Sequence, residues 1–404
     1  MGIKLLCLLI AICAPWLAWA EGVVPQVEVT FQWGPEALTV VHQGGSLSVS
    51  LLSPAVTLSG ERLGGLAPLS IAGNLAAPEG LTLYYPAQPL SASGTLLSHV
   101  TLTFDAGARE LRKTLRLGLS EDAERRLIED ITLERLPAAG VDFSPAPPYS
   151  YPAFGKGWFA GIEFPVATTR IEGEDLVLSH APGKWLEPGE WRESRTEVIG
   201  FVPVGQEIAV FKQYVRNLRG PRSGIHINYN SWWTSGVPFN EEEILGLMEE
   251  FRVNLTERSG QHFDSFAIDL GWSDPKTLWE IDRKSFPQGF EGISKGTRRM
   301  DSYLGLWMSP SVFYPQAFDT EWAREQGYET QVIDWGSKLR LMCLGGPKYQ
   351  QAYQQRMVEM ATVWGVRHYK FDGFYVTCNE TDHGHEPGVL SCETVAEGLI
   401  SVFE

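Results

Sequence analysis

The sequence predicts a multidomain protein, an antiparallel β-sandwich followed by the first four strands of a (β/α)8 barrel. Residues 21–220 hold many short alternating runs bounded by turn formers, with almost no helical period. From Ile225 onward, strand-like runs alternate with helical periods, which is typical of a parallel sheet. Several of these runs end in an acid or a tryptophan, as the strands of a barrel do where they build an active site.

Residues 1–20 have the features of a secretory signal peptide. Lys4 supplies the positive start, Leu5 to Ile12 the apolar stretch, and Ala18-Trp19-Ala20 a cleavage site of the small-x-small type. The apolar stretch is too short for a membrane span, and Pro15 breaks it. We therefore expect an exported protein, secreted or periplasmic, without a membrane span.

The predicted sandwich covers residues 21–220. Its alternating runs are Gln26–Phe31, Val100–Phe104, Leu111–Leu117, Trp158–Phe164, Leu176–Leu178 and Arg195–Phe201. Many short strands with turn punctuation favour two packed antiparallel sheets. A helix is expected from about Glu207, and Asn217 to Pro221 reads as a linker to the second part.

The second part, residues 221–404, predicts the first half of a barrel. Its expected strands are Ile225–Asn230, Ser265–Leu270, Tyr303–Met308 and Arg367–Asp372, with Leu339–Leu344 as an excursion between the third and the fourth. Its clearest expected helices are one that Asn240 caps, Pro347–Val363 and Glu393–Phe403. A whole barrel takes about 250 residues, so we expect strands one to four only.

The charge balance excludes some ligand classes. The chain has 33 Lys and Arg against 49 Asp and Glu, a net charge of −16. Nucleic acid needs a basic footprint, so it is not an expected partner. Anionic membranes and polyanions are disfavoured for the same reason. Neutral ligands such as uncharged sugars remain compatible with this surface.

The clearest chemical signal is Lys370-Phe371-Asp372, which ends a short apolar run. Lys370 and Asp372 are two residues apart, so their side chains point to the same side of the strand. A lysine inside a strand needs a charged partner, because buried lysines are rare. Asp269 ends an earlier run in the same way.

Five motifs in one order resemble glycoside hydrolase family 36 and its clan D relatives, the α-galactosidase group. They are Asn230-Ser231-Trp232-Trp233, Ile268-Asp269-Leu270-Gly271-Trp272, Phe286 to Phe290, Leu304 to Pro310 and Tyr369 to Asp372. The run Gly157 to Pro165 is similar to part of that family's leading sandwich.

The resemblance implies a retaining glycosidase with Asp372 as its nucleophile. It implies that Lys370 contacts the sugar and helps to keep Asp372 ionised, and that Asp269 binds hydroxyls of a terminal galactose. The expected apolar walls of the pocket are Trp232, Trp233, Trp272 and Trp307. In the family the general acid/base lies beyond strand four, so we expect it outside these 404 residues.

Three positions depart from the family pattern. Leu270 stands where the family has a second Asp, Ser309 where a Glu is common, and Phe374 where an Asn is usual. These changes remove polar sugar contacts but leave the nucleophile in place. The sugar and its linkage therefore stay open.

Three cysteines remain after signal cleavage, namely Cys343, Cys378 and Cys392. We expect a disulfide between Cys378 and Cys392, worth about 3 kcal/mol for a loop of roughly 15 residues. His383 and His385 lie in the same loop, which raises zinc as an alternative. The spacing does not match the short Cys-x₂₋₄-Cys pattern of zinc sites, so the sequence predicts no metal and no cofactor.

Together these features predict an exported retaining α-glycosidase, most like an α-galactosidase, acting on an oligosaccharide or glycoconjugate. The 404 residues alone are expected to be inactive. One alternative is a non-catalytic carbohydrate-binding protein on the same scaffold, and another is a transglycosidase with the same nucleophile. The oligomeric state stays open.

Overall fold

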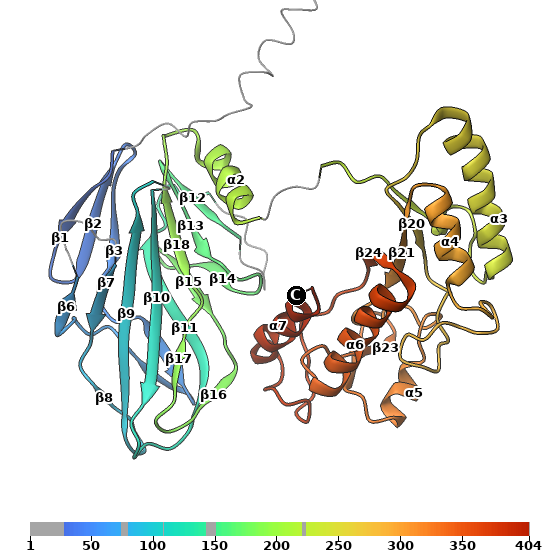
Figure 1. Cartoon of the computed structure of the whole chain (residues 1–404). Coiled ribbons are helices and arrows are strands. Elements are labelled where there is room, and N and C mark those ends of the chain that lie inside the picture. The colour runs from blue at the N-terminus through green and yellow to red at the C-terminus, as the bar shows by residue number, and fades with distance from the viewer. Residues whose placement is uncertain (1–27, 74–79, 108, 143–150, 220–223, 404) are drawn as a thin grey trace, which may run out of the picture.

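The structure is a computed structural model that describes residues 28–73, 80–107, 109–142, 151–219 and 224–403. It has a β-rich part and an α/β part (Figure 1). The predicted signal peptide lies outside the described residues. In the described ranges, no helix is long and apolar enough to cross a membrane.

Antiparallel strands of the β-rich part form three sheets within the described residues. One sheet has β12 (Ala153–Gly155), β13 (Trp158–Ile162), β18 (Glu197–Phe201), β10 (Glu110–Leu119), β9 (Thr95–Asp105), β7 (Leu81–Tyr84) and β6 (Ser70–Ala72), with β17 (Trp191–Glu193) and β8 (Gln88–Pro89) beside β10 and β9. A second has β14 (Thr168–Glu172), β15 (Asp175–His180), β11 (Arg126–Pro137), β4 (Ala55–Leu58) and β5 (Glu61–Leu63), with β16 (Lys184–Leu186) beside β11. The third has β1 (Thr30–Trp33), β2 (Ala37–His42) and β3 (Gly45–Ser50).

The three sheets share one apolar core. Along β9, buried and half-exposed residues alternate, as the period of two in its sequence predicts. An ion pair between Lys113 of β10 and Glu134 of β11 crosses this core, and both side chains are buried. The Lys113 Nζ also donates to the carbonyl oxygen of Ser50, 3.1 Å away. The expected strands of this part are confirmed with shifted ends. The first, expected from Gln26, begins at Thr30 as β1, and its residues 26 and 27 lie outside the described ranges.

The predicted helix at Glu207 is confirmed as α2 (Glu207–Leu218). It packs on the large sheet through Tyr214, which joins Phe159 and Val198 in a small apolar cluster. Figure 1 shows α2 at the end of the β-rich part from which the chain crosses to the α/β part.

The α/β part contains a parallel sheet with the order β19-β20-β21-β24. Its strands are β19 (Asn228–Asn230), β20 (Ser265–Ile268), β21 (Tyr303–Met308) and β24 (Val366–Phe371). All four predicted strands are therefore present. The first begins three residues later than expected, at Asn228 instead of Ile225.

A hairpin stands apart from the parallel sheet, between β21 and β24. It consists of β22 (Thr330–Asp334) and β23 (Lys338–Met342), which pair antiparallel with each other. The interpretation of Leu339–Leu344 as an excursion is thus confirmed, although the sequence did not reveal its partner strand.

Helices of the α/β part follow the strands. They are η1 (Ser231–Trp233), α3 (Glu241–Phe251) with its π-helical extension η2 (Arg252–Glu257), α4 (Glu291–Arg299), α5 (Thr320–Glu325), α6 (Pro347–Trp364), η3 (Val389–Ser391) and α7 (Cys392–Phe403). The predicted cap of α3 is present, because the Asn240 side chain accepts from the Glu243 N–H in a capping box.

The sequence pattern did not predict α4, a short helix with two glycines. A Cβ at Gly292 would stand 2.8 Å from Glu241 Oε1, and one at Gly296 would stand 2.8 Å from Met248 Sδ. The glycines therefore let α4 approach α3 closely, at the cost of a weak local helix signal.

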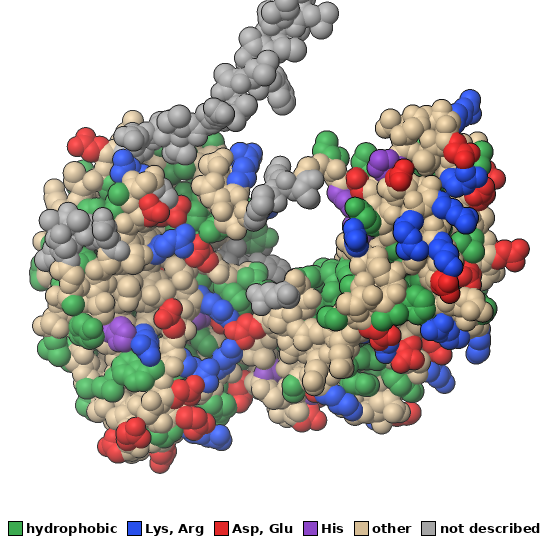
Figure 2. Space-filling view, viewed as in Figure 1, with side chains coloured by type: hydrophobic (Ala, Val, Ile, Leu, Met, Phe, Trp, Pro, Cys, Tyr) green, Lys and Arg blue, Asp and Glu red, His purple; other side chains and the backbone are tan. Residues whose placement is uncertain are grey.

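The two parts touch through α7 (Figures 1 and 2). Glu393 is 3% exposed, and its carboxylate lies 2.6 Å from His180 Nδ1 and 3.2 Å from Arg195 Nε. Glu397, one turn later, pairs with Lys184 at 2.5 Å and also with Arg195. This charged cluster fixes the helix against the β-rich part.

Candidate active site

Asp372 directly follows β24, at the carboxyl end of the parallel sheet. Its backbone N–H donates to the Met308 carbonyl oxygen at 3.0 Å, which continues the pairing with β21 by one residue. Its Oδ2 accepts a hydrogen bond from Trp307 Nε1 at 3.3 Å. The carboxylate is half-buried, so a ligand can reach it.

Tyr314 lies near the Asp372 carboxylate, whose negative charge acts on its phenol group. Its ring packs edge-on against the Trp307 ring, with 5.4 Å between the centroids. Burial raises the pKa of Tyr314, and the negative charges of Asp372 and Asp269 raise it further. Tyr314 therefore stays protonated and lies close enough to both carboxylates to feel their charge.

Lys370 pairs with Asp269, with 2.7 Å between Nζ and Oδ2, although the two are 101 residues apart in sequence. The prediction that Lys370 needs a charged partner is thus confirmed. The Leu270 N–H donates to Asp269 Oδ1 at 2.8 Å, and the Asp269 N–H donates to Ser231 Oγ at 2.9 Å. The Asp269 side chain is 4% exposed and that of Lys370 is 37% exposed, so the pair has one buried and one open end.

The register of the sheet explains why these residues meet. Trp307 of β21 stands opposite Lys370 of β24, and Asp269 follows Ile268, which stands opposite Leu306. Side chains at one level of neighbouring parallel strands point to the same side. Asp269, Trp307 and Lys370 thus occupy adjacent positions at the edge where barrels place their active sites.

The four predicted tryptophans have different environments. Trp232 and Trp233 of η1 are 51% and 81% exposed, so a ligand can reach them. Trp307 is buried, with its indole N–H directed to Asp372. Trp272 is fully buried, packs against Trp279 and Phe290, and donates to the Trp307 carbonyl oxygen at 2.8 Å. Its place in the core contradicts the prediction that it lines the pocket.

The departures from the family pattern lie close to this site. Leu270 is 6% exposed. Ser309 is fully buried, and its Oγ accepts from the Phe313 N–H at 3.3 Å, so it stabilises the loop after β21. Phe374 is 45% exposed. Gly373, before it, has φ +77°, and a Cβ there would stand 2.6 Å from the Phe313 ring, so this turn requires glycine.

The predicted Cys378–Cys392 disulfide is wrong for this structure, in which both cysteines are free and buried. Cys392 begins α7, and its Sγ lies 3.5 Å from Thr377 Oγ1. Cys378 Sγ instead lies 3.3 Å from His383 Nδ1. The loop thus turns the two sulfurs toward different neighbours.

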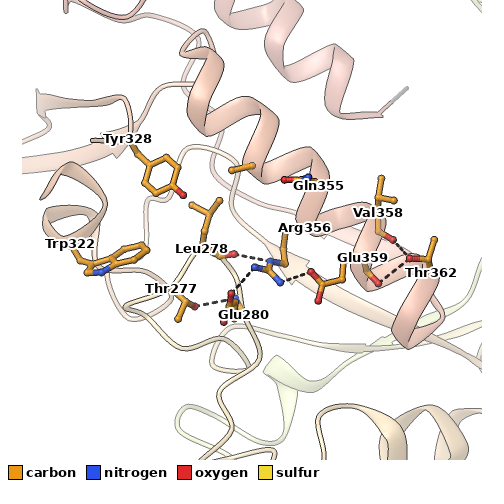
Figure 3. A pocket seen from close by; sticks show the side chains of 11 residues that line it. Thr277, Leu278, Glu280, Trp322, Tyr328, Gln355, Arg356, Val358, Glu359 and Thr362 are labelled. Atoms are coloured by element: carbon orange, nitrogen blue, oxygen red, sulfur yellow. Dashed lines mark hydrogen bonds and ion pairs between the residues drawn. The ribbon is translucent and has the colours of Figure 1, made fainter. Parts of the chain in front are cut away.

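A separate cavity of about 590 Å³ lies beside α6. Figure 3 shows Arg356 at its centre, donating to the Leu278 carbonyl oxygen at 3.0 Å, to Glu280 at 2.9 Å and to Glu359 at 2.6 Å. The Arg356 guanidinium group thus already has three acceptors from the protein. None of the predicted site residues lines the cavity. It is therefore not the candidate active site.

Sequence reasoning missed Tyr314 and the role of Ser231. Tyr314 lies in the loop after β21, and such loops form the active-site face of a barrel, so its position was the available signal. Asn230, which ends β19, adds a buried Nδ2 that has no hydrogen-bond partner among the described residues. An unpartnered buried donor calls for an explanation, and a ligand contact is one.

Comparison with solved structures finds a similar fold in α-galactosidases. The GH36 α-galactosidase AgaB from Geobacillus stearothermophilus has a TM-score of 0.64 at 12% identity, over 93% of this chain and 70% of that one. A variant of the GH36 α-galactosidase AgaA from the same organism, in complex with raffinose, has a TM-score of 0.60 at 12% identity over the same shares. The chain has the fold of GH36 α-galactosidases.

Among curated proteins, α-galactosidase AgaA from Geobacillus stearothermophilus is 26% identical over 96 residues. The match spans 22% of this chain and only 12% of that relative. No protein-family model matches the chain. The family resemblance found in the motifs is nevertheless confirmed, because these similar proteins are α-galactosidases, glycoside hydrolases that act on O-glycosyl bonds.

Proposed function

We propose that this chain is the nucleophile-bearing portion of an exported retaining α-glycosidase of the α-galactosidase kind. In this proposal its β-rich part is a sandwich, residues 21–220, and its α/β part is the first half of a (β/α)8 barrel. The observation that carries the proposal is Asp372, half-buried at the end of β24 and hydrogen-bonded by Trp307. A carboxylate so placed can attack an anomeric carbon.

In the proposed reaction, an Asp372 oxygen forms a bond to the anomeric carbon while the bond to the leaving oxygen breaks. A second carboxyl group protonates that oxygen and then removes a proton from the attacking water, so the product keeps its configuration. Retaining enzymes hold the two carboxyl groups about 5–5.5 Å apart. We leave the acid/base unassigned, since the family resemblance places it beyond strand four.

The remaining side chains of the site suit recognition of a neutral sugar. The buried Asp269 carboxylate and the partly exposed Lys370 ammonium offer an acceptor and a donor side by side. Asn230 adds its unpartnered Nδ2. Trp232 and Trp233 offer exposed aromatic surface on which a sugar ring can stack. We infer an oligosaccharide or glycoconjugate substrate with a terminal α-linked sugar.

Leu270 and Ser309 favour a second candidate within the same scaffold. Both are buried, so neither supplies the polar sugar contact that an Asp or Glu would supply there. Such a pocket would suit a sugar other than galactose, or a carbohydrate-binding protein without turnover. A transglycosidase would use the same nucleophile with a sugar as acceptor.

The test is hydrolysis of p-nitrophenyl α-glycosides by the protein from its complete gene, with the first-formed anomer followed by proton NMR. We expect retention of configuration, and a loss of at least about 10³-fold in kcat for Asp372→Asn. Asp334→Asn, an exposed acid at the end of β22, is the matched control and should leave kcat unchanged. Saturable sugar binding without turnover would favour the binding protein, and oligosaccharide products at high acceptor concentration would favour the transglycosidase.

A further inference from the structure

Four side chains that can bind a metal form one buried cluster at the loop that follows β24. They are Cys343, Cys378, His383 and His385, and their ligand atoms all lie within 4.8 Å of one another. Cys343 Sγ is 3.3 Å from His385 Nε2, and Cys378 Sγ is 3.3 Å from His383 Nδ1. All four are more than nine-tenths buried. A neutral thiol is a weak hydrogen-bonding group, so thiol and imidazole contacts alone explain this clustering poorly.

The second ring nitrogen of each histidine is directed to an oxygen atom. His385 Nδ1 lies 3.0 Å from the Glu386 carbonyl oxygen, and His383 Nε2 lies 3.6 Å from Asp382 Oδ1. Metal-binding histidines commonly donate their other N–H to a carbonyl or a carboxylate, which fixes the tautomer and orients the ring. The other two ring nitrogens, His385 Nε2 and His383 Nδ1, face the sulfurs.

Gly345, two residues after Cys343, leaves room for the His385 ring. A Cβ there would lie 2.7 Å from His385 Cδ2.

We propose that Cys343, Cys378, His383 and His385 bind one Zn²⁺ ion in a tetrahedral structural site. Zinc–sulfur bonds of about 2.3 Å and zinc–nitrogen bonds of about 2.0–2.1 Å place neighbouring tetrahedral ligands about 3.4–3.8 Å apart. The two contacts of 3.3 Å and the limit of 4.8 Å for the whole cluster bracket this range.

The donor set decides the kind of site. Two thiolates balance the charge of a divalent cation, so a buried site carries no net charge. Sulfur and imidazole nitrogen favour zinc over magnesium or calcium, which prefer oxygen. Four protein ligands leave no open position for a substrate, so the ion stabilises structure and does not catalyse.

The zinc ion would join two segments that no strand pairing connects. Cys343 directly follows β23, while the other three ligands lie in the loop that begins after Asp372. The same loop reaches the β-rich part, where the Trp185 indole N–H donates to Glu386 at 2.8 Å. The ion therefore holds the loop that runs from the candidate nucleophile to the contact between the two parts. This inference replaces the sequence-based expectation of no metal, and it does not depend on the proposed catalytic activity.

The first test measures zinc per chain by mass spectrometry. The purified protein is incubated with Zn²⁺ alone, freed of excess metal and compared with Cys378→Ser and His385→Ala. The matched control is Cys392→Ser, a buried cysteine whose Sγ faces Thr377 outside the cluster. We expect about one zinc per chain in wild type and control, and less than about 0.2 in the other two variants.

The second test keeps the proposal falsifiable if those variants fail to fold. Wild-type protein loaded with Co²⁺ should show the visible bands of a tetrahedral ion and a thiolate charge-transfer band. A folded wild type that retains less than about 0.2 zinc per chain would overturn the proposal. A Cys343–Cys378 disulfide in the peptide map of the non-reduced protein would overturn it as well, because it would consume both sulfur ligands.

Discussion

Replacing Lys370 by methionine should cost more stability than replacing Asp269 by asparagine, although both changes break the same ion pair. The difference follows from burial, since the Asp269 side chain is 4% exposed and that of Lys370 is 37% exposed. Lys370→Met leaves a buried carboxylate whose remaining donor is the Leu270 N–H. Asp269→Asn leaves an ammonium group that water can solvate.

The magnitudes follow from the geometry. At 2.7 Å and an effective dielectric constant of about 20, the pair attracts by roughly 6 kcal/mol, most of which desolvation offsets. Removing one partner of a fully buried pair costs about 3–5 kcal/mol, whereas exposed pairs are worth about 0–1 kcal/mol. Because one end of this pair is open, we expect about 3 kcal/mol for Lys370→Met and about 1 kcal/mol for Asp269→Asn.

The assay is urea unfolding at pH 7 of the wild type, both single variants and the double variant. The double variant should lose less than the sum of the single losses, by about 1–2 kcal/mol, because each single change already breaks the pair. Equal losses for the two single variants, or additivity within about 0.3 kcal/mol, would refute the asymmetric ion pair.

Three further variants test other parts of the structure. Burial raises the pKa of Glu197 to about 8, so the folded state keeps a proton that the unfolded chain releases, and the free energy of unfolding should fall between pH 5 and 8.5. Glu197→Gln should reduce this decline by about 3 kcal/mol in urea unfolding. An unchanged decline in the variant would contradict the raised pKa. Burial alone would raise the pKa of Glu393, but the hydrogen bonds and charges of His180 and Arg195 together outweigh burial and lower that pKa. The stability that Glu393 contributes is therefore present above pH 4.5 and lost as pH falls. Glu393→Gln should therefore cost about 2 kcal/mol at pH 7 and less at pH 4 in thermal unfolding, and a loss independent of pH would argue against this contact. Tyr314→Phe removes the hydroxyl group that lies near Asp372 and should lower kcat/KM about tenfold with little change in Tm, whereas unchanged kinetics would exclude this hydroxyl from the reaction.

The sequence predicted which residues meet at the carboxyl edge of the parallel sheet, because the strand period and the position of each residue in its strand are visible in the sequence. Asp269 directly follows β20 and Lys370 is the penultimate residue of β24, and parallel pairing with β21 brings them together. The Asn240 capping box likewise depends on residues three apart. Such local patterns can be recognised in the sequence without any knowledge of packing.

Other features depend on contacts that no local pattern encodes. Trp272 is core and Trp232 is exposed, although both follow strands in the same manner. Cys378 lies near Cys343 and not in a disulfide with Cys392. Cys343 reaches the cluster from the end of β23, which is far away in sequence. The short spacing between Cys378 and Cys392 favoured a disulfide between them. Cys392 begins α7, however, and its sulfur points to Thr377.

The most direct test of the central claim is covalent labelling of the nucleophile. An active preparation of the protein from its complete gene is treated with an α-galactosyl-configured fluorosugar that traps the glycosyl-enzyme, and the labelled peptide is sequenced by mass spectrometry. The account predicts one sugar attached to Asp372, and no label in Asp372→Asn. A sugar on another carboxylate, or turnover with inversion of configuration and no adduct, would contradict it.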